Sequence, residues 1–383
     1  MKKIKIPYGK QFIDNNDINI TGLSLKSSLI TTGPYVESFE LKLKKLLNSK
    51  FALTCNNGTA GLHLAFQAID LKKKDTIIMP VINFIAAYRI ANLMGANIYL
   101  ADVDKFTGQM TPQSLLDCIK KNKLKKIKAV LTMYLGGSPE NNLDFYKIKK
   151  IYKFYLIEDA CHAFGSQYIF NKRKYFVGSC KHSDICVFSF HPVKTITTGE
   201  GGAVTTNNKF FAKKMFYSRS HGIIRNKKYW TYDIKNLGNN YRLSDINAAL
   251  GISQLKKLKK FLTIRKNIYL FYKKKLKDFF LFPNYYYKNI NSHHLCITSL
   301  NFSKMKKEKN DLFKFLNLNN IYPQYHYIPI YKFSFYKKKI KSYKNAEYYY
   351  KNSISLPIYV GLKNIEQIFI IKKLLQFANT GKS

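Results

Sequence analysis

The 383-residue sequence has no apolar run that approaches the roughly 18–20 residues of a membrane-spanning helix. Its charged opening is followed by Tyr8, Gly9 and Lys10, which interrupt any apolar stretch, so a secretory signal peptide is not expected. The six cysteines include no Cys-x-x-Cys pair, which argues against a disulfide scaffold and against a zinc site. These absences predict a globular protein of the reducing cytoplasm, with no membrane partner and no bound metal.

Acidic residues are also scarce. The sequence contains 22 Asp and Glu but 65 Lys and Arg, which gives a formal net charge of +43. Such a charge leaves a nucleic-acid-binding or regulatory protein as one alternative. The lysine runs at residues 72–74, 273–275 and 337–339 are dispersed, however, and Lys is enriched together with Asn, Ile, Tyr and Phe, as A/T-rich codons would produce. No helix-turn-helix, RNA-recognition or zinc-finger pattern is present. We therefore expect solvated lysine faces and no specific nucleic-acid partner.

Short apolar runs alternate with segments of helical length through the first half of the chain. This alternation predicts an α/β fold with a mainly parallel sheet covered by helices on both faces. Ligands of such sheets bind beyond the carboxyl ends of the strands. The expected strands are residues 51–55, 76–81, 97–101, 129–133, 155–158, 185–190 and 203–206, and the expected helices are 58–69, 85–93, 113–121 and 142–152.

The alternation of short apolar runs and helical segments does not continue after Asp245. Residues 246–277 have the pattern of one long helix, and a mixed α+β region follows it to residue 383. We expect a large domain over residues 1–255, which includes an amino-terminal segment, and a smaller C-terminal α+β domain over residues 256–383.

Lys194 is the most informative single residue. It follows an expected strand and lies in a loop rich in Thr and Gly, with no other Lys or Arg between His191 and Gly202, although lysine is common elsewhere. A lysine beside a closely approached backbone suits a Schiff-base nucleophile, which reacts once its amine is desolvated and neutral. The alternative is one more surface lysine.

Asp159 marks the carboxyl end of the strand expected at 155–158, and His162 follows three residues later. An aspartate at that place, facing a pyridine nitrogen, keeps the nitrogen protonated and makes the ring an electron sink. Helix capping by Asp159 and simple core packing of His162 remain alternatives.

The segment Cys55–Ala60 lies between an expected strand and an expected helix, and it contains Gly58 and Thr59. Backbone N–H groups at a helix N-terminus bind phosphate, and glycine permits close approach. The spacing is neither Walker-type nor G-x-G-x-x-G, so ATP and NAD are disfavoured. A phosphate site, a partner for a ring nitrogen and a Schiff-base lysine on one parallel sheet are together what pyridoxal 5′-phosphate (PLP) requires.

Several motifs are similar to those of a known protein family, and the resemblance extends over nearly the whole chain, from Tyr8 to about Leu375. They are residues 29–34 (Leu-Ile-Thr-Thr-Gly-Pro), 57–60 (Asn-Gly-Thr-Ala), 158–160 (Glu-Asp-Ala), 188–202 and 238–245 (Gly-Asn-Asn-Tyr-Arg-Leu-Ser-Asp). With them the chain resembles the DegT-type sugar-nucleotide aminotransferases, a fold-type-I PLP family. Residues 190–202, 326–329 and 345–349 are most similar to the branch that makes UDP-4-amino-4,6-dideoxy-N-acetyl-β-L-altrosamine, an intermediate toward pseudaminic acid.

The resemblance implies roles for individual residues at the cofactor. Lys194 would bind PLP covalently and move the proton, and Asp159 would face the pyridine nitrogen. Other implied contacts are stacking on the ring by Phe84, a position beside the phenolic oxygen for His162, phosphate contacts from Gly58, Thr59 and Ser189, and a phosphate contact from Asn240 of a second subunit.

The resemblance also implies substrates and assembly. His326, Thr32 and Tyr8 would lie near the sugar. The implied reaction moves an amino group from L-glutamate to C4 of a UDP-linked 4-keto-6-deoxy-N-acetyl hexose, in a homodimer with shared active sites. Tyr134, Leu135, Gly136 and Gly137 replace a more usual His-Phe-Ala-Gly-type run, so the same chemistry on a dTDP-, GDP- or other UDP-linked keto sugar is an open alternative.

Overall fold

The structure, a computed structural model, describes residues 5–225, 230–234, 236–303, 305–337 and 343–379. Two residues of the lysine run at 337–339, the first four residues and the end of the C-terminal region fall outside these ranges. Across the described residues, no helix is long and apolar enough to span a membrane.

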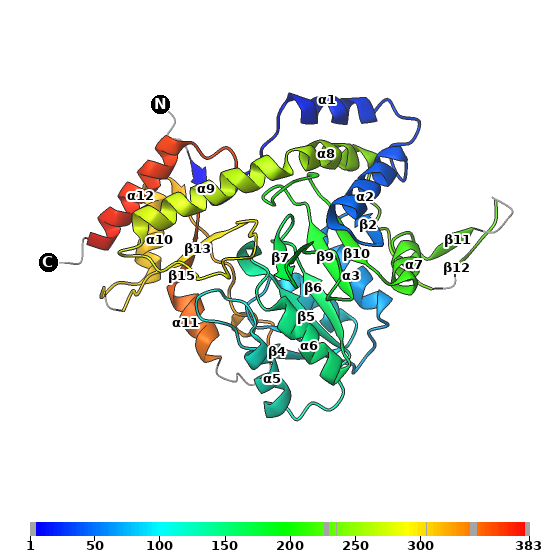
Figure 1. Ribbon diagram of the computed structural model, residues 1–383, viewed down its shortest axis with the longest axis horizontal. Helices are drawn as coiled ribbons and strands as arrows, with labels where there is room; N and C mark the ends of the chain where they lie inside the picture. Colours follow the sequence, from blue (N-terminus) through cyan, green and yellow to red (C-terminus); the bar gives the residue numbers. More distant parts are fainter. Residues whose placement is uncertain (1–4, 226–229, 235, 304, 338–342, 380–383) are drawn as a thin grey trace.

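Within the described residues, seven strands form the central sheet, in the order β2-β10-β9-β6-β5-β3-β4. Figure 1 shows helices around this sheet. All neighbouring pairs are parallel except those of β10, which is antiparallel to β2 and to β9. The predicted mainly parallel sheet is therefore confirmed, with strand ends within one residue of the expected ones. The strands are β2 (Phe51–Cys55), β3 (Thr76–Pro80), β4 (Asn97–Ala101), β5 (Ala129–Met133), β6 (Tyr155–Asp159), β9 (Ile185–Ser189) and β10 (Gly202–Thr206).

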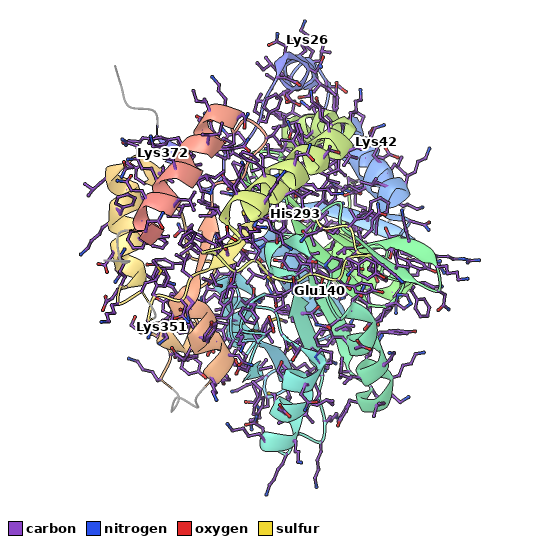
Figure 2. All side chains as sticks on the ribbon, turned by 60° about the vertical axis from the view of Figure 1, so that its left-hand side comes forward. Lys26, Lys42, Glu140, His293, Lys351 and Lys372 are labelled. Atoms are coloured by element: carbon purple, nitrogen blue, oxygen red, sulfur yellow. The ribbon has the colours of Figure 1, made fainter. Side chains whose placement is uncertain are left out.

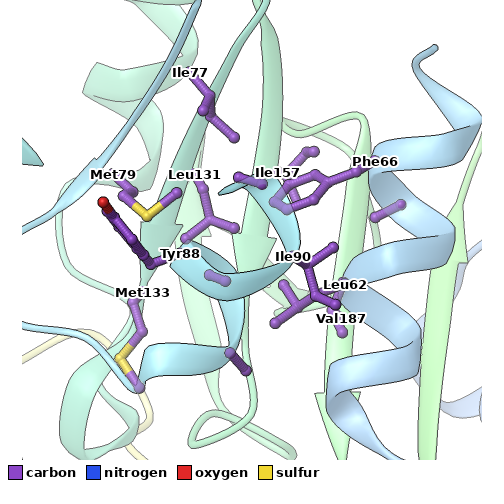
Figure 3. Close-up of a cluster of buried hydrophobic side chains, with 14 of the residues drawn as sticks. Leu62, Phe66, Ile77, Met79, Tyr88, Ile90, Leu131, Met133, Ile157 and Val187 are labelled. Atoms are coloured by element: carbon purple, nitrogen blue, oxygen red, sulfur yellow. The ribbon is translucent and has the colours of Figure 1, made fainter. Parts of the chain in front are cut away.

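Helices cover both faces of the sheet because successive strand side chains point to opposite sides. On one face α3 (Gly58–Ala68), α4 (Ile85–Leu93) and α7 (Lys209–Ser218) bury their apolar sides. Figure 3 shows this contact: residues of α3 and α4 meet residues of the strands, namely Leu62, Phe66, Tyr88 and Ile90 against Ile77, Met79, Leu131, Met133, Ile157 and Val187.

The other face is covered by two groups of helices. One group is α2 (Pro34–Leu47) with α8 (Asp245–Lys256), and the other is α5 (Pro112–Lys121) with α6 (Asn142–Tyr152). The side chains of Ile78, Val130 and Leu156, each one residue out of phase with the first cluster, pack against α5 and α6. Strands buried on both faces are what a doubly covered parallel sheet requires.

The single helix expected over residues 246–277 is wrong in one respect, because α8 and α9 (Leu258–Leu276) are separate helices that meet at Lys257. The N–H of Lys257 bonds the carbonyl of Gln254, three residues back, at 3.0 Å. Its ammonium group bonds the carboxylates of Asp14, at 2.9 Å, and Asp17, which lie at the start of α1 (Asn15–Ser24). This bridge ties the amino-terminal helix to the junction.

The C-terminal region has an apolar cluster of its own, built on α9, α10 (Lys309–Leu318) and α12 (Asn364–Asn379) (Figure 1). Its small sheet pairs β13 (Cys296–Ser299) with β15 (Ser353–Leu356) in antiparallel fashion. The amino-terminal β1 (Ile6–Pro7) pairs with β14 (Ile321–Tyr322), so Ile6 packs in this cluster. The helix α11 (Lys344–Asn352) precedes β15. The domain boundary near residue 255 stays a prediction.

Two antiparallel hairpins were not expected from the sequence. They pair β7 (Gln167–Phe170) with β8 (Arg173–Phe176), and β11 (Ile223–Arg225) with β12 (Tyr232–Ile234). The first lies just after the segment that contains Asp159 and His162. The second precedes the motif at residues 238–245.

Candidate active site

A cavity of about 500 Å³ lies beyond the carboxyl ends of β5, β6 and β9. Of the residues that the sequence singled out, all but Thr32 and Asn240 line it. They come from the sheet and its loops (Gly58, Thr59, Phe84, Asp159, His162, Ser189 and Lys194), from the amino-terminal segment (Tyr8) and from the C-terminal region (His326). The topology therefore brings together groups that are more than 300 residues apart in the sequence.

One wall of the cavity is the N-terminus of α3. Asn57 caps the helix by accepting the N–H of Ala60 at 2.8 Å, and the next residues, Gly58 and Thr59, line the cavity. A Cβ at Gly58 would stand 3.0 Å from Cβ of Ser189 and 3.2 Å from Sγ of Cys161, so only glycine fits without displacing them. Early helical amides with the positive end of the helix dipole form a ready site for phosphate.

Lys194 lines the same cavity from the loop between β9 and β10. Phe190 anchors this loop, because its N–H bonds the carbonyl of Gly201 at 2.8 Å and its carbonyl accepts the N–H of Thr198 at 3.0 Å. Burial lowers the pKa of Lys194 from its usual value, and the nearby Cys161 and Asp159 oppose this effect. An amine that deprotonates more easily is the form that attacks a carbonyl carbon.

Asp159 is the last residue of β6, between the ends of β5 and β9, and it is buried. Its Oδ1 accepts the backbone N–H of Cys161 at 3.2 Å. Burial raises the pKa of this carboxyl, while the bonds from Cys161 and the charge of Lys194 lower it. A protonated ring nitrogen beside Asp159 would, like the charge of Lys194, lower the pKa of the Asp159 carboxyl and favour its ionised form.

Aromatic side chains from both parts of the chain form the rest of the cavity. Phe84 precedes α4 and stays 53% exposed, with its ring centroid 5.7 Å from that of Tyr327. The hydroxyl of Tyr327 lies 3.0 Å from Nε2 of His162. His326 packs against Tyr8 at 5.0 Å between ring centroids, and its Nδ1 lies 2.9 Å from Oγ of Ser355. Tyr327 was not singled out from the sequence, although it directly follows His326 in the segment 326–329 that carries part of the resemblance.

Thr32 and Asn240 are exposed and outside the cavity, but one buried side chain holds their two motifs together. The carboxylate of Asp245 accepts the N–H groups of Gly33 at 2.7 Å and Tyr35 at 2.8 Å at the start of α2. The carbonyl of Asn240 accepts Nδ2 of Asn56, next to the α3 cap, at 3.4 Å. Asn240 therefore lies near the N-terminus of α3 without lining the cavity, and Asp245 links its motif to the motif that contains Thr32.

The loop at residues 134–137 also stays out of the cavity. Tyr134 and Leu135 are buried, and the Tyr134 hydroxyl donates to Glu158 on the side of β6 away from Asp159. The residues that replace the more usual run in this loop therefore do not line the cavity.

A half-buried lysine, a buried aspartate and a helix N-terminus around one cavity, on this sheet topology, are the groups that a PLP-dependent enzyme requires. The groups fit that cofactor. Asp159 is a buried carboxylate that lacks a cationic side chain in bonding contact among the described residues, and Gly58 leaves the close approach that a phosphate needs.

Comparison with known proteins identifies the class more closely. A model of the DegT/DnrJ/EryC1/StrS aminotransferase family matches residues 11–375, and the chain belongs to this family. It is 37% identical over 379 residues to the UDP-4-amino-4,6-dideoxy-N-acetyl-beta-L-altrosamine transaminase of Campylobacter jejuni subsp. jejuni serotype O:23/36 (strain 81-176), covering 97% of this chain and 96% of that protein.

Solved structures agree on the fold. Helicobacter pylori PseC, an aminotransferase involved in the biosynthesis of pseudoaminic acid, superposes with a TM-score of 0.89 at 28% identity, covering 98% of this chain and 100% of PseC. Spr1654 from Streptococcus pneumoniae in its PLP form superposes with a TM-score of 0.89 at 24% identity, covering 99% and 100% of the two chains. The protein is a PLP-dependent sugar aminotransferase.

Proposed function

We propose that the protein transfers the amino group of L-glutamate to C4 of a UDP-linked 4-keto-6-deoxy-N-acetyl hexose, giving UDP-4-amino-4,6-dideoxy-N-acetyl-β-L-altrosamine. The observation that carries this proposal is the 37% identity to a transaminase named for that product, which extends over nearly the whole of both chains. The similarity to PseC supports the same assignment.

We assign the roles of the chain's residues as follows. Nζ of Lys194 would hold the cofactor between turnovers and, once released, would move a proton between the reacting carbon of the donor or sugar and the C4′ carbon of the cofactor. Asp159 keeps a proton on the ring nitrogen, Phe84 covers the ring, and the wall formed by Gly58, Thr59 and Ser189 binds the phosphate. PLP, when bound, supplies the electron sink for the carbanion.

The choice of sugar and donor is tested by turnover. We expect kcat/KM to be highest for the UDP-4-keto-6-deoxy-N-acetyl hexose, by at least about tenfold over dTDP- and GDP-linked keto sugars, the scale of a few lost contacts. Glutamate should bleach the yellow colour of the purified protein, since the same cofactor must first accept the amine. Protein without added donor is the control. A higher kcat/KM on another nucleotide would favour the alternative substrate, and faster bleaching by another amino acid would replace glutamate.

We also propose that the active site is shared between two subunits. Lys194 is the only Lys or Arg among the described residues that line the cavity, in a chain of net charge +43. A nucleoside diphosphate and a dicarboxylic donor together carry several negative charges, which call for cationic partners. A second subunit could provide them, and the exposed Asn240 motif beside the phosphate-binding wall is where we expect it to contribute.

Sharing predicts complementation between two inactive variants. Lys194→Ala and Asn240→Asp, each inactive alone, should regenerate activity when mixed subunits exchange, because one site of each heterodimer then receives both intact residues. Random exchange would restore about a quarter of the wild-type rate. Mixing Lys194→Ala with Asp159→Asn is the matched control and should stay inactive, since we place both residues in one chain's site. Heterodimers verified by mass that show no recovery would contradict sharing through Asn240.

The basic surface does not require a nucleic-acid partner. Figure 2 shows Lys26, Lys42, Lys351 and Lys372 at separate places around the periphery, and all four are exposed. Dispersed lysines of this kind fit solvated faces better than a binding groove. We therefore propose no nucleic-acid function.

A further inference from the structure

His162 has both ring nitrogens occupied by partners within the chain. Its Nδ1 lies 3.4 Å from the backbone N–H of Gly136, and its Nε2 lies 3.0 Å from the hydroxyl of Tyr327. A backbone N–H can only donate, so Nδ1 must be the acceptor and the ring proton must be on Nε2. Burial lowers the pKa of His162 well below its usual value, which keeps the ring neutral.

This assignment fixes the direction of the second hydrogen bond. Because Nε2–H donates, the Tyr327 oxygen accepts, and the proton of the Tyr327 hydroxyl is left to donate elsewhere. His294 packs against the ring of His162, with centroids 4.2 Å apart, so the imidazole has little room to turn. Tyr327 lines the cavity and contacts Phe84.

We propose that Tyr327, and not His162, donates the hydrogen bond to the phenolic oxygen of bound PLP, with His162 acting as a positioning residue that orients the Tyr327 hydroxyl. The chain of donors runs from Gly136 N–H to His162, from His162 to Tyr327, and from Tyr327 into the cavity. The Tyr327 side chain contacts Phe84 and His162 and lines the cavity that also holds Asp159 and Lys194. Its hydroxyl would therefore lie at the edge of the space that the PLP ring would occupy. The inference depends on the cofactor alone and not on the sugar.

A donor at that oxygen has a measurable consequence. It stabilises the negative charge of the phenolate most strongly when the nitrogen that links Lys194 to the cofactor is unprotonated. Removing the donor should therefore raise the pH at which that nitrogen loses its proton and the visible absorbance changes. Hydrogen bonds to charged groups correspond to a shift of about one pH unit or more. The titratable groups around Tyr327 are Tyr8, Asp159, Cys161, His162, Lys194, His326 and Tyr349.

The experiment titrates the absorbance of the holoenzyme with neither amino donor nor sugar present, so its failure is distinguishable from an error in the proposed substrate. Tyr327→Phe, which keeps the ring, should raise the absorbance midpoint by about one pH unit. Tyr331→Phe is the matched control. It removes a tyrosine hydroxyl four residues away that donates to Glu347 outside the cavity, and it should leave the midpoint unchanged.

A second measurement identifies the acceptor even if the Phe variant is less stable. Wild type and Tyr327→Phe are freed of cofactor and titrated with PLP or with 3-deoxypyridoxal 5′-phosphate, which lacks the phenolic oxygen. We expect Tyr327→Phe to raise the Kd of PLP about tenfold and to leave the Kd of the analogue within about twofold. Equal losses for both ligands would mean that the hydroxyl donates to something other than the cofactor. An unchanged midpoint in Tyr327→Phe together with a raised midpoint in His162→Asn would overturn the proposal and make His162 the direct donor.

Discussion

Replacing Lys194 with alanine should abolish transamination while PLP still binds, without a covalent link. The amine of Lys194 lies in a cavity that also holds Asp159 and the α3 N-terminus, and burial lowers its pKa. The variant loses both the covalent attachment and the group that moves the proton. Proton transfer by a positioned side chain alone contributes about 10²–10⁴-fold, so we expect kcat to fall by at least about 10³-fold. Turnover is measured with excess PLP, so that weaker cofactor binding does not limit it.

Borohydride reduction of the wild-type protein should fix the cofactor to the peptide that contains Lys194. Lys309 provides a demanding control, because burial lowers its pKa to about 7 and thus makes its amine reactive as well. Its ammonium group, however, contacts the rings of Tyr325 and Tyr350 and the carbonyl of Ser353, and it does not line the cavity. Label on Lys309 or on any other lysine in place of Lys194 would refute the assignment.

The strands of the central sheet were predictable because each is a short apolar run between turn residues and helical segments. Burial on both faces makes such runs nearly continuous in apolar residues, as in residues 129–133 and 185–189. The hairpin of β7 and β8 lacked this signal. Its turn residues Asn171 and Lys172 both have positive φ, 47° and 61°, as a two-residue hairpin turn requires, but Lys in the second position hides the usual Asn-Gly pattern.

Only the site residues whose positions follow from a neighbouring strand could be predicted from the sequence. Lys194 and Gly58 follow strands β9 and β2, and Asp159 ends β6; the carboxyl ends of these three strands meet at one edge of the sheet, so the proximity of the three residues follows from the fold. The contact of Tyr327 with His162 joins residues 165 positions apart, and that of Asp245 with Gly33 joins residues 212 apart. No spacing rule reports such contacts. They depend on how the C-terminal region and α8 pack against the sheet.

Changing Asp159 to asparagine should lower kcat/KM by about 10²–10⁴-fold, the scale of a lost electrostatic partner in a buried site. The substitution separates the two interpretations of this residue. The bond from the Cys161 N–H to Oδ1 needs only an oxygen acceptor, which an asparagine side chain also has. If Asp159 merely shapes the turn after β6, the variant should be nearly as active as wild type. If its charge holds a proton on the ring nitrogen, the loss should be large although the fold is kept.

Glu158→Gln is the matched control for this test, because Glu158 is the neighbouring buried carboxylate on the same strand. Its oxygens accept the hydroxyls of Tyr134 and Ser183, and it does not line the cavity. Glutamine would place an NH₂ group, which is a hydrogen-bond donor, where Glu158 presents an acceptor oxygen to a hydroxyl donor. We therefore expect a lower melting temperature, with kcat/KM within a few-fold of wild type. Comparable losses of kcat/KM in both variants would show that any buried carboxylate at the end of β6 supports the site through the fold. A loss confined to Asp159→Asn would assign the effect to the charge that faces the cofactor.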